Sequence, residues 1–274
     1  MRPSTLVKIG VVAAIPLALL AMHFLLPRLS RWISGAHTGS EGLETEHFVV
    51  YAPSPDVAKS AGAAAEEFAA DFVRRWGQAR GIELPEDRLH VYIFADHEAL
   101  TRHGLLKQGQ ALERNAGYFS SGERLIALVG AEPEGLRHEL THMFLALSWP
   151  GADPSSWLNE GMAQWHESGA EGSLPTAVAR DVAAAMAGGS ALPLEELLEA
   201  EPFDFTGERN RRFYFESATL FAWLAERRPE ALEKYLADEK APGPVRPGAL
   251  ERATGLDAGG IAREWREYVA AKSR

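Results

Sequence analysis

Segments with the composition of a β-strand occur only before residue 130 of this sequence. They are short and rich in branched and aromatic side chains, and they cover residues 47–51, 89–94, 116–119 and 125–129. Two segments between them predict helices, a long one over 57–78 and a short one over 95–104 that is capped by Asp96. This order predicts an α+β fold, with a small mixed sheet and helices over 46–150 and a helical second half over 151–274.

The N-terminus carries an uncharged apolar run of 18 residues, from Ile9 to Leu26. Such a run can just span a hydrocarbon core of about 30 Å. Arg28, Arg31 and Trp32 follow it and suit a membrane interface. We therefore predict a transmembrane helix within an anchor of residues 1–34, a linker over 35–45, and a single-pass membrane protein whose main domain is extracytoplasmic. A cleaved signal peptide is the main alternative and a buried core helix the other.

The charge distribution argues against a nucleic-acid partner. Residues 1–40 hold four bases and no acid. Residues 41–274 therefore hold 24 of the 28 bases and all 38 acids, which gives them a net charge of −14. A body of that charge repels phosphates. The chain has no cysteine, which excludes disulfides, thiolate metal sites and cysteine nucleophiles.

Two histidines at helical spacing follow the last predicted strand. His138 and His142 lie at positions i and i+4 of a helix that Pro133 can start and residues 149–151 can end. Both imidazoles can then reach one tetrahedral zinc ion at about 2.0–2.1 Å. Glu139 follows the first histidine and can reach a zinc-bound water instead of the metal.

A third ligand is predicted at Glu160, 18 positions after His142. Residues 153–156 predict the start of a second helix, and a tight turn between the two helices can bring Glu160 back to the metal. The sequence therefore predicts a Zn²⁺ site made by His138, His142 and Glu160, with an open fourth position for water. A metal-free pair of helices is the alternative.

The two motifs together resemble those of the gluzincin metallopeptidases, which include the thermolysin and aminopeptidase N families. The resemblance is carried by His138-Glu139-x-x-His142 and by Asn159-Glu160, which is followed by a glycine. The wider order of segments is most similar to small bacterial peptidase MA-like domains over residues 45–165, and more weakly to the C-terminus.

This resemblance implies a zincin-like catalytic domain over 46–274, with His138, His142 and Glu160 as zinc ligands and Glu139 as general base. It also implies an edge strand that binds the substrate backbone, and Ala116, Gly117 and Tyr118 occupy its place. An ordinary sheet edge is the alternative.

A tyrosine that stabilises the oxyanion is a further family feature. Tyr214, at the start of a helix predicted over 214–227, is the first candidate and Tyr118 the second. A core aromatic residue is the alternative for Tyr214.

The sequence departs from the family at Gln164. Thermolysin-like enzymes place an aspartate there, four positions after the ligand glutamate, to orient a histidine. Orientation must here come from a carbonyl, from the Gln164 amide or from another carboxylate. His166 is expected to point away from the metal, and the acidic segment 195–201 is expected to be a solvated helix face.

These observations predict a membrane-anchored zinc metallopeptidase that hydrolyses peptide or protein substrates. Two alternatives remain open. The domain can be a catalytically silent zinc-containing binding domain, or an anchored interaction module without a metal. Glu139 favours the enzyme, because a structural zinc site does not require it.

Overall fold

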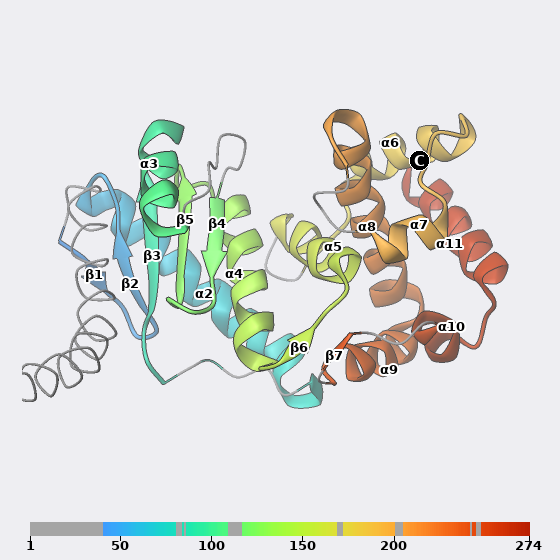
Figure 1. The fold of residues 1–274 in the computed structure, drawn as a ribbon, viewed down its shortest axis with the longest axis horizontal. Helices are drawn as coiled ribbons and strands as arrows, with labels where there is room; N and C mark the ends of the chain where they lie inside the picture. Colours follow the sequence, from blue (N-terminus) through green and yellow to red (C-terminus); the bar gives the residue numbers. More distant parts are fainter. Residues whose placement is uncertain are drawn as a thin grey trace, which may run out of the picture.

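The computed structural model contains a five-stranded mixed sheet and a set of packed helices (Figure 1). The residues it describes are 41–80, 84, 86–108, 117–168, 172–200, 205–241, 243–244 and 248–274. The predicted anchor 1–34 and most of the linker lie outside them. Among the described residues, no helix combines the length and apolarity that crossing a bilayer requires.

The strands lie in the order β1-β2-β3-β5-β4. Their bounds are β1 Leu43–Glu44, β2 Phe48–Tyr51, β3 Leu89–Phe94, β4 Gly117–Ser120 and β5 Leu125–Val129. The central strands β2, β3 and β5 are parallel, whereas β1 and β4 are antiparallel to their neighbours and form the two edges. The predicted α+β class is confirmed. Because β1 lies within the predicted linker, the folded part begins before residue 46.

Helices cover both faces of this sheet. Alternate side chains of the strands, such as Val91 and Ile126, join the main core with α2 (Pro55–Arg80) and α4 (Pro133–Ser148). The side chains between them, including Tyr92 and Tyr118, form a smaller cluster with Leu100 of α3 (His97–Gln108). Successive side chains of a strand point to opposite faces of the sheet. Every second residue of the edge strand β4 therefore points to the face that α4 covers.

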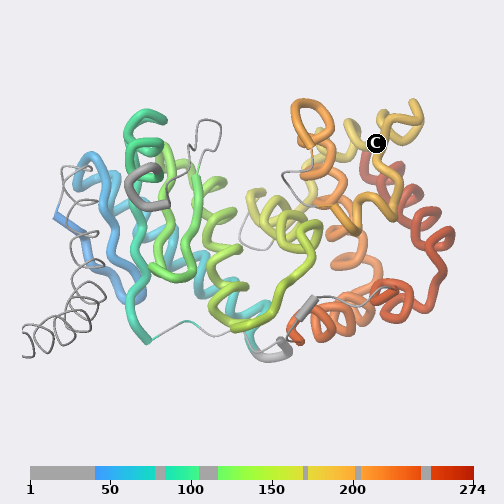
Figure 2. The backbone as a smooth tube through the Cα atoms, viewed as in Figure 1, coloured from blue at the N-terminus to red at the C-terminus, as the bar shows by residue number. Residues whose placement is uncertain are grey.

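The second half is helical, as predicted, and begins with α5 (Ser156–Glu167). Its other helices are α6 Thr176–Ala187, α7 Leu194–Glu199, α8 Gly207–Arg227, α9 Pro229–Glu239, α10 Ala249–Thr254 and α11 Ala258–Lys272. Two-residue strands β6 (Ala152–Asp153) and β7 (Gly243–Pro244) pair in parallel, so the expectation that strands end at residue 130 is wrong. In Figures 1 and 2, α4 and α5 lie between the sheet and the helices α6 to α11.

Several element ends differ from their predicted positions. The α8 helix begins at Gly207, so Tyr214 lies inside the helix and not at its start. Asp96 caps α3 as predicted, since its Oδ1 accepts a hydrogen bond from the Ala99 N–H at 2.8 Å. The strand β4 extends one residue beyond its predicted end at 119, so the turn between β4 and β5 spans 121–124, where Arg124 has a positive φ of 53°.

A buried carboxyl group in α8 makes stability depend on pH. Glu216 is fully buried, and its Oε2 accepts a hydrogen bond from the Leu192 N–H at 3.0 Å, whereas its Oε1 has no partner among the described residues. Burial raises the pKa of Glu216 to about 7, against the lowering effects of that hydrogen bond and of Arg212. The folded state thus binds a proton that the unfolded state releases near pH 4.5, and stability falls as pH rises from about 4.5 through 7.

We expect Glu216→Gln to remove this dependence, because the amide keeps the acceptor and cannot ionise. Relative to the parent, its free energy of unfolding should rise by about 3 kcal/mol between pH 5 and pH 8. Denaturant unfolding at the two pH values measures it, with the exposed Glu195→Gln as a control of equal charge change. If the free energies of unfolding of Glu216→Gln and the parent differed by the same amount at pH 5 and at pH 8, Glu216 would titrate as an ordinary glutamate.

Candidate metal centre

The helix α4 carries the histidine pair. Pro133 occupies the first turn as predicted, and the Trp149 N–H ends the helix by bonding to the Leu145 carbonyl at 3.0 Å. One side of α4 is apolar and buried, and His138 and His142 follow each other along an adjacent side that faces α5 and β4. The amphipathic pattern of α4 thus fixes the direction of both imidazoles.

The helix α5 brings Glu160 to them. It starts at Ser156, as predicted, and the buried Glu239 of α9 holds its N-terminus by accepting hydrogen bonds from the Ser155 N–H at 2.8 Å and the Ser155 hydroxyl at 2.6 Å. Gly161 allows α8 to approach closely, because a Cβ there would lie 2.5 Å from the Ser217 carbonyl oxygen. The packing of α5 against α9 thus depends on Ser155, and its packing against α8 depends on Gly161, the residue after Glu160.

Three atoms of these residues form a triangle that fits a metal ion. The Nε2 atoms of His138 and His142 lie 3.0 Å apart, and Glu160 Oε2 lies 3.5 Å from each of them. A tetrahedral ion with bonds near 2.05 Å requires ligand atoms roughly 3.3 Å apart. Glu160 Oε2 is buried and accepts no well-formed hydrogen bond from a described residue. The residues therefore fit a bound cation, and no other group of this kind occurs among the described residues.

The other nitrogen of each imidazole has an acceptor. His138 Nδ1 lies 2.7 Å from Glu167 Oε1, and His142 Nδ1 lies 2.9 Å from Asn159 Oδ1. Both Nδ1 atoms therefore carry the proton when the rings are neutral, which leaves both Nε2 lone pairs directed at the centre of the triangle. With both rings neutral, two lone pairs 3.0 Å apart would repel, and a positive charge between them, from a proton or a metal ion, removes the repulsion.

The charges of the site favour a cation as well. Burial raises the pKa of Glu160, but the two imidazoles outweigh it and lower that pKa to about 2. Burial lowers the pKa of His138, but its interactions with the carboxylates of Glu160 and Glu167 outweigh it and raise that pKa to about 10. Glu160 is thus ionised at neutral pH, and positive charge at the triangle stabilises it.

Glu139 lies against the edge strand and not in the triangle. Burial raises its pKa, whereas His138 and His142 lower it. A Cβ at Gly117 would lie 3.0 Å from Glu139 Oε1 and 3.0 Å from the Ala127 carbonyl oxygen, so a larger residue there would press on the Glu139 carboxylate. The structure thus brings Glu139 and Gly117 together, at the face of β4 that the metal ligands share.

The edge strand presents alternate residues to this site. Phe119 stacks on His142 with ring centroids 5.9 Å apart, two positions after Gly117. Tyr118 between them faces the other side of the sheet, where its hydroxyl lies 2.6 Å from His103 Nδ1. The Tyr118 hydroxyl therefore cannot serve as the second oxyanion candidate. Its backbone remains on β4, which pairs with β5 alone among the described strands, and Ala116 lies outside the described residues.

Tyr214 of α8 lies near the two carboxylates of the site. Burial raises the pKa of Tyr214, and the negative charges of Glu160 and Glu139 raise it further. The hydroxyl thus stays protonated at neutral pH and can donate a hydrogen bond. Its ring is half-buried, so it is not a fully enclosed core residue.

Sequence reasoning missed three residues of the site. Asn159, Glu167 and Phe119 contact the two histidines. Asn159 stood inside the predicted ligand motif and Phe119 inside the predicted strand 116–119, but no contact with the histidines was expected of either. His166 points away as expected and is fully buried, where its Nε2 accepts a hydrogen bond from Trp76 Nε1–H at 3.0 Å. In the acidic segment, Glu195 and Glu199 are exposed as expected, and residue 201 lies outside the described part of the chain.

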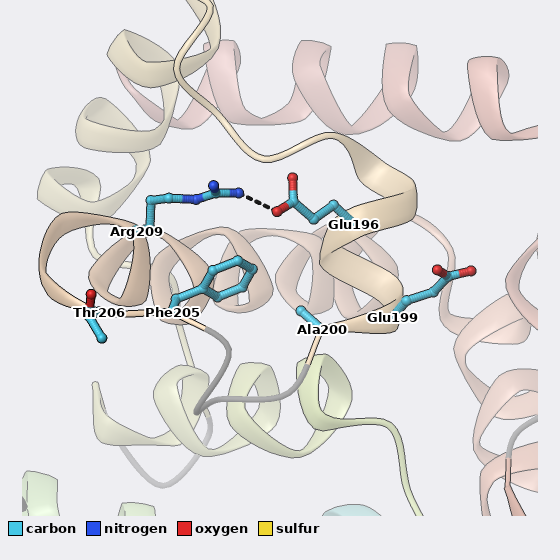
Figure 3. Close-up of a pocket in the computed structure, with 6 residues that line it drawn as sticks. All are labelled: Glu196, Glu199, Ala200, Phe205, Thr206 and Arg209. Carbon is cyan, nitrogen blue, oxygen red and sulfur yellow. Dashed lines mark hydrogen bonds and ion pairs between the residues drawn. The ribbon is translucent and has the colours of Figure 1, made fainter.

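A pocket of about 450 Å³ lies away from these ligands, between α7 and the start of α8. Figure 3 shows its lining side chains, which are Glu196, Glu199, Ala200, Phe205, Thr206 and Arg209. Arg209 forms an ion pair with Glu196 and lies over the Phe205 ring at 5.0 Å. Arg209 and Glu196 thus neutralise each other, and none of the lining residues belongs to the metal centre.

Comparisons with protein-family models and with curated proteins find no match to this sequence. Membership of the gluzincins therefore stays a prediction from the two motifs.

Proposed function

We propose that this chain is a zinc-dependent peptidase with a zincin-like catalytic domain. The observation that carries the proposal is the position of Glu139 beside a triangle of two Nε2 atoms and one carboxylate oxygen. A purely structural zinc site does not need a carboxylate there, whereas hydrolysis needs a general base. The choice of zinc rests on the His-His-Glu donor set.

The chemistry divides between the metal and the chain. A zinc ion at the triangle would lower the pKa of a water molecule and polarise the scissile carbonyl. Glu139 accepts the proton of the attacking water at its carboxylate and passes it to the leaving amine. Tyr214 donates its hydroxyl hydrogen to the developing oxyanion. The edge strand β4 offers backbone N–H and carbonyl groups to an extended peptide, which adds as a further strand.

Cleavage of a mixed peptide library tests the proposal directly. Purified full-length protein in detergent is expected to cleave peptides, to stop when a chelator removes the metal, and to recover when zinc is restored. Mass spectrometry of the products identifies the cleaved bonds. A zinc-loaded protein that leaves the whole library intact would favour a silent binding domain.

Replacing Tyr214 by phenylalanine separates its role from metal binding. Loss of one oxyanion donor typically lowers turnover by about 10²–10³-fold, and we expect a loss of that size in kcat. Zinc content should not change, because Tyr214 is outside the ligand triangle. Steady-state kinetics with metal analysis measures both. Parent-like kcat in Tyr214→Phe would assign oxyanion stabilisation to another group and leave the zinc chemistry in place.

The apolar run 9–26 supports the further proposal of a membrane anchor with the catalytic domain outside the cytoplasm. We expect the full-length protein to stay with membranes after an alkaline wash. Mass spectrometry of the mature N-terminus is the second measurement. A free protein whose N-terminus lies near residue 37 would show that the segment is a cleaved signal peptide.

A further inference from the structure

The last turn of α5 carries a carboxylate outside the ligand triangle. Glu167 Oε1 lies 2.7 Å from His138 Nδ1, on the side of the imidazole away from Nε2. The same oxygen accepts a hydrogen bond from the Gln164 side-chain amide at 2.5 Å. Glu167 is thus placed to act on the metal through His138 and not as a ligand.

The backbone of Glu167 is fixed independently of its side chain. Arg137 of α4 donates from Nε to the His166 carbonyl at 2.9 Å and also donates to the Glu167 carbonyl. These carbonyls lie in the last turn of α5, where the carbonyls of a helix lack the regular partner of its interior, and the His166 carbonyl also accepts a hydrogen bond from the Ser168 N–H. Because Arg137 directly precedes His138, one turn of α4 holds both the imidazole and the backbone that carries its acceptor.

The two histidines differ in the charge of their acceptors. His138 donates to a carboxylate, whereas His142 donates to the neutral amide oxygen of Asn159 at 2.9 Å. A carboxylate acceptor increases the electron density on the opposite ring nitrogen more than an amide does, so it makes Nε2 a stronger metal ligand. The asymmetry predicts that His138 binds the metal more strongly than His142.

We propose that Glu167 is the positioning residue that orients His138 and sets the metal affinity of the site, and that Gln164 holds its carboxylate in place. This proposal rests on the metal centre of the proposed function. Position 164 holds a glutamine and has no carboxylate to orient a histidine. The proposal assigns that orienting role to Glu167. Arg137 connects α4 to α5 by itself, so a structural connection does not explain the Glu167 side chain.

The test measures metal affinity and the spectrum of the metal, not peptide cleavage. Full-length parent, Glu167→Gln, Gln164→Ala and the exposed control Glu195→Gln are purified in detergent and titrated with Co²⁺ and Zn²⁺ against a competing chelator. Partners of metal-binding histidines typically change affinity by about 10–100-fold. We expect Glu167→Gln to bind both metals at least about 10-fold more weakly and to shift the visible absorption bands of Co²⁺. Gln164→Ala should weaken metal binding and shift the Co²⁺ bands in the same direction but by less. Glu195→Gln should match the parent in both measurements.

Parent-like affinity and parent-like Co²⁺ bands in Glu167→Gln would overturn the proposal. An equal loss in Glu195→Gln would also overturn it, because net charge would then explain the effect. If Glu167→Gln does not fold, Gln164→Ala decides in the same way, since it keeps the carboxylate and removes only its support. A parent that binds metal but cleaves no peptide contradicts the peptidase proposal alone, and a parent that binds no metal overturns both.

Discussion

Glutamine in place of Glu139 is expected to abolish nearly all peptide cleavage while the protein keeps its metal and its fold. The amide has nearly the size of the carboxyl group but cannot accept the proton of the attacking water at neutral pH. General-base catalysis is typically worth about 10²–10⁴-fold, so kcat should fall by at least that factor. Glu139 contributes no atom to the ligand triangle, and zinc content should stay near that of the parent. Single-turnover cleavage and metal analysis of one preparation measure both.

A matched control lies on the same helix. Glu134 is in the first turn of α4 and its side chain is 62% exposed, so Glu134→Gln changes the net charge equally without touching the triangle. It should cleave like the parent. Cleavage at the parent rate by Glu139→Gln would contradict the enzyme proposal at its centre and would favour the silent zinc-containing binding domain.

Two of the three central strands could be predicted to the residue. The bounds of β3 and β5 are the predicted ranges 89–94 and 125–129. Both strands are parallel members of the sheet with helices on both faces, so nearly every side chain in them is buried and the apolar run has sharp ends. The edge strand β4 is half-polar, and its prediction is one residue early.

Elements that depend on distant residues could not be predicted. Ala152 pairs with Gly243 across the helical half, and two residues of strand leave no local pattern. The first turns of α8 are rich in charged residues, where Arg211 bonds to Glu208 at 2.8 Å, so no apolar periodicity indicates the start at Gly207.

The three residues of the ligand triangle could be predicted and the hydrogen-bond partners of its histidines could not. The spacing of His138 and His142 along one helix encodes their shared direction, whatever the rest of the fold does. The acceptor of His138 depends on the packing of α5 against α4, which decides whether residue 164 or residue 167 meets the ring. Sequence spacing carries no information on that packing. The structure selects Glu167, one of the possibilities that the absence of an acid at Gln164 left open.

Loss of a metal ligand is the other change with a large expected effect. The parent is expected to hold about one zinc per chain, and His142→Ala and Glu160→Ala should each lose most of it. Without Glu160, the two Nε2 atoms face each other with no anion to complete the site, and without His142 only one nitrogen and one oxygen remain. Metal analysis after dialysis measures the loss, with the exposed His97→Ala as a control.

Thermal unfolding gives an independent measure of the same ligands. A metal that binds only the folded state stabilises it by about 2.7 kcal/mol when its free concentration is 100 times the dissociation constant. Added zinc should therefore raise the Tm of the metal-free parent and of His97→Ala, and it should leave the Tm of His142→Ala and Glu160→Ala nearly unchanged. The two ligand variants should also agree with each other, because each removes one vertex of a single triangle. Full zinc content and a parent-like rise in Tm in both variants would contradict the ligand assignment, and with it the position from which Glu139 is proposed to act.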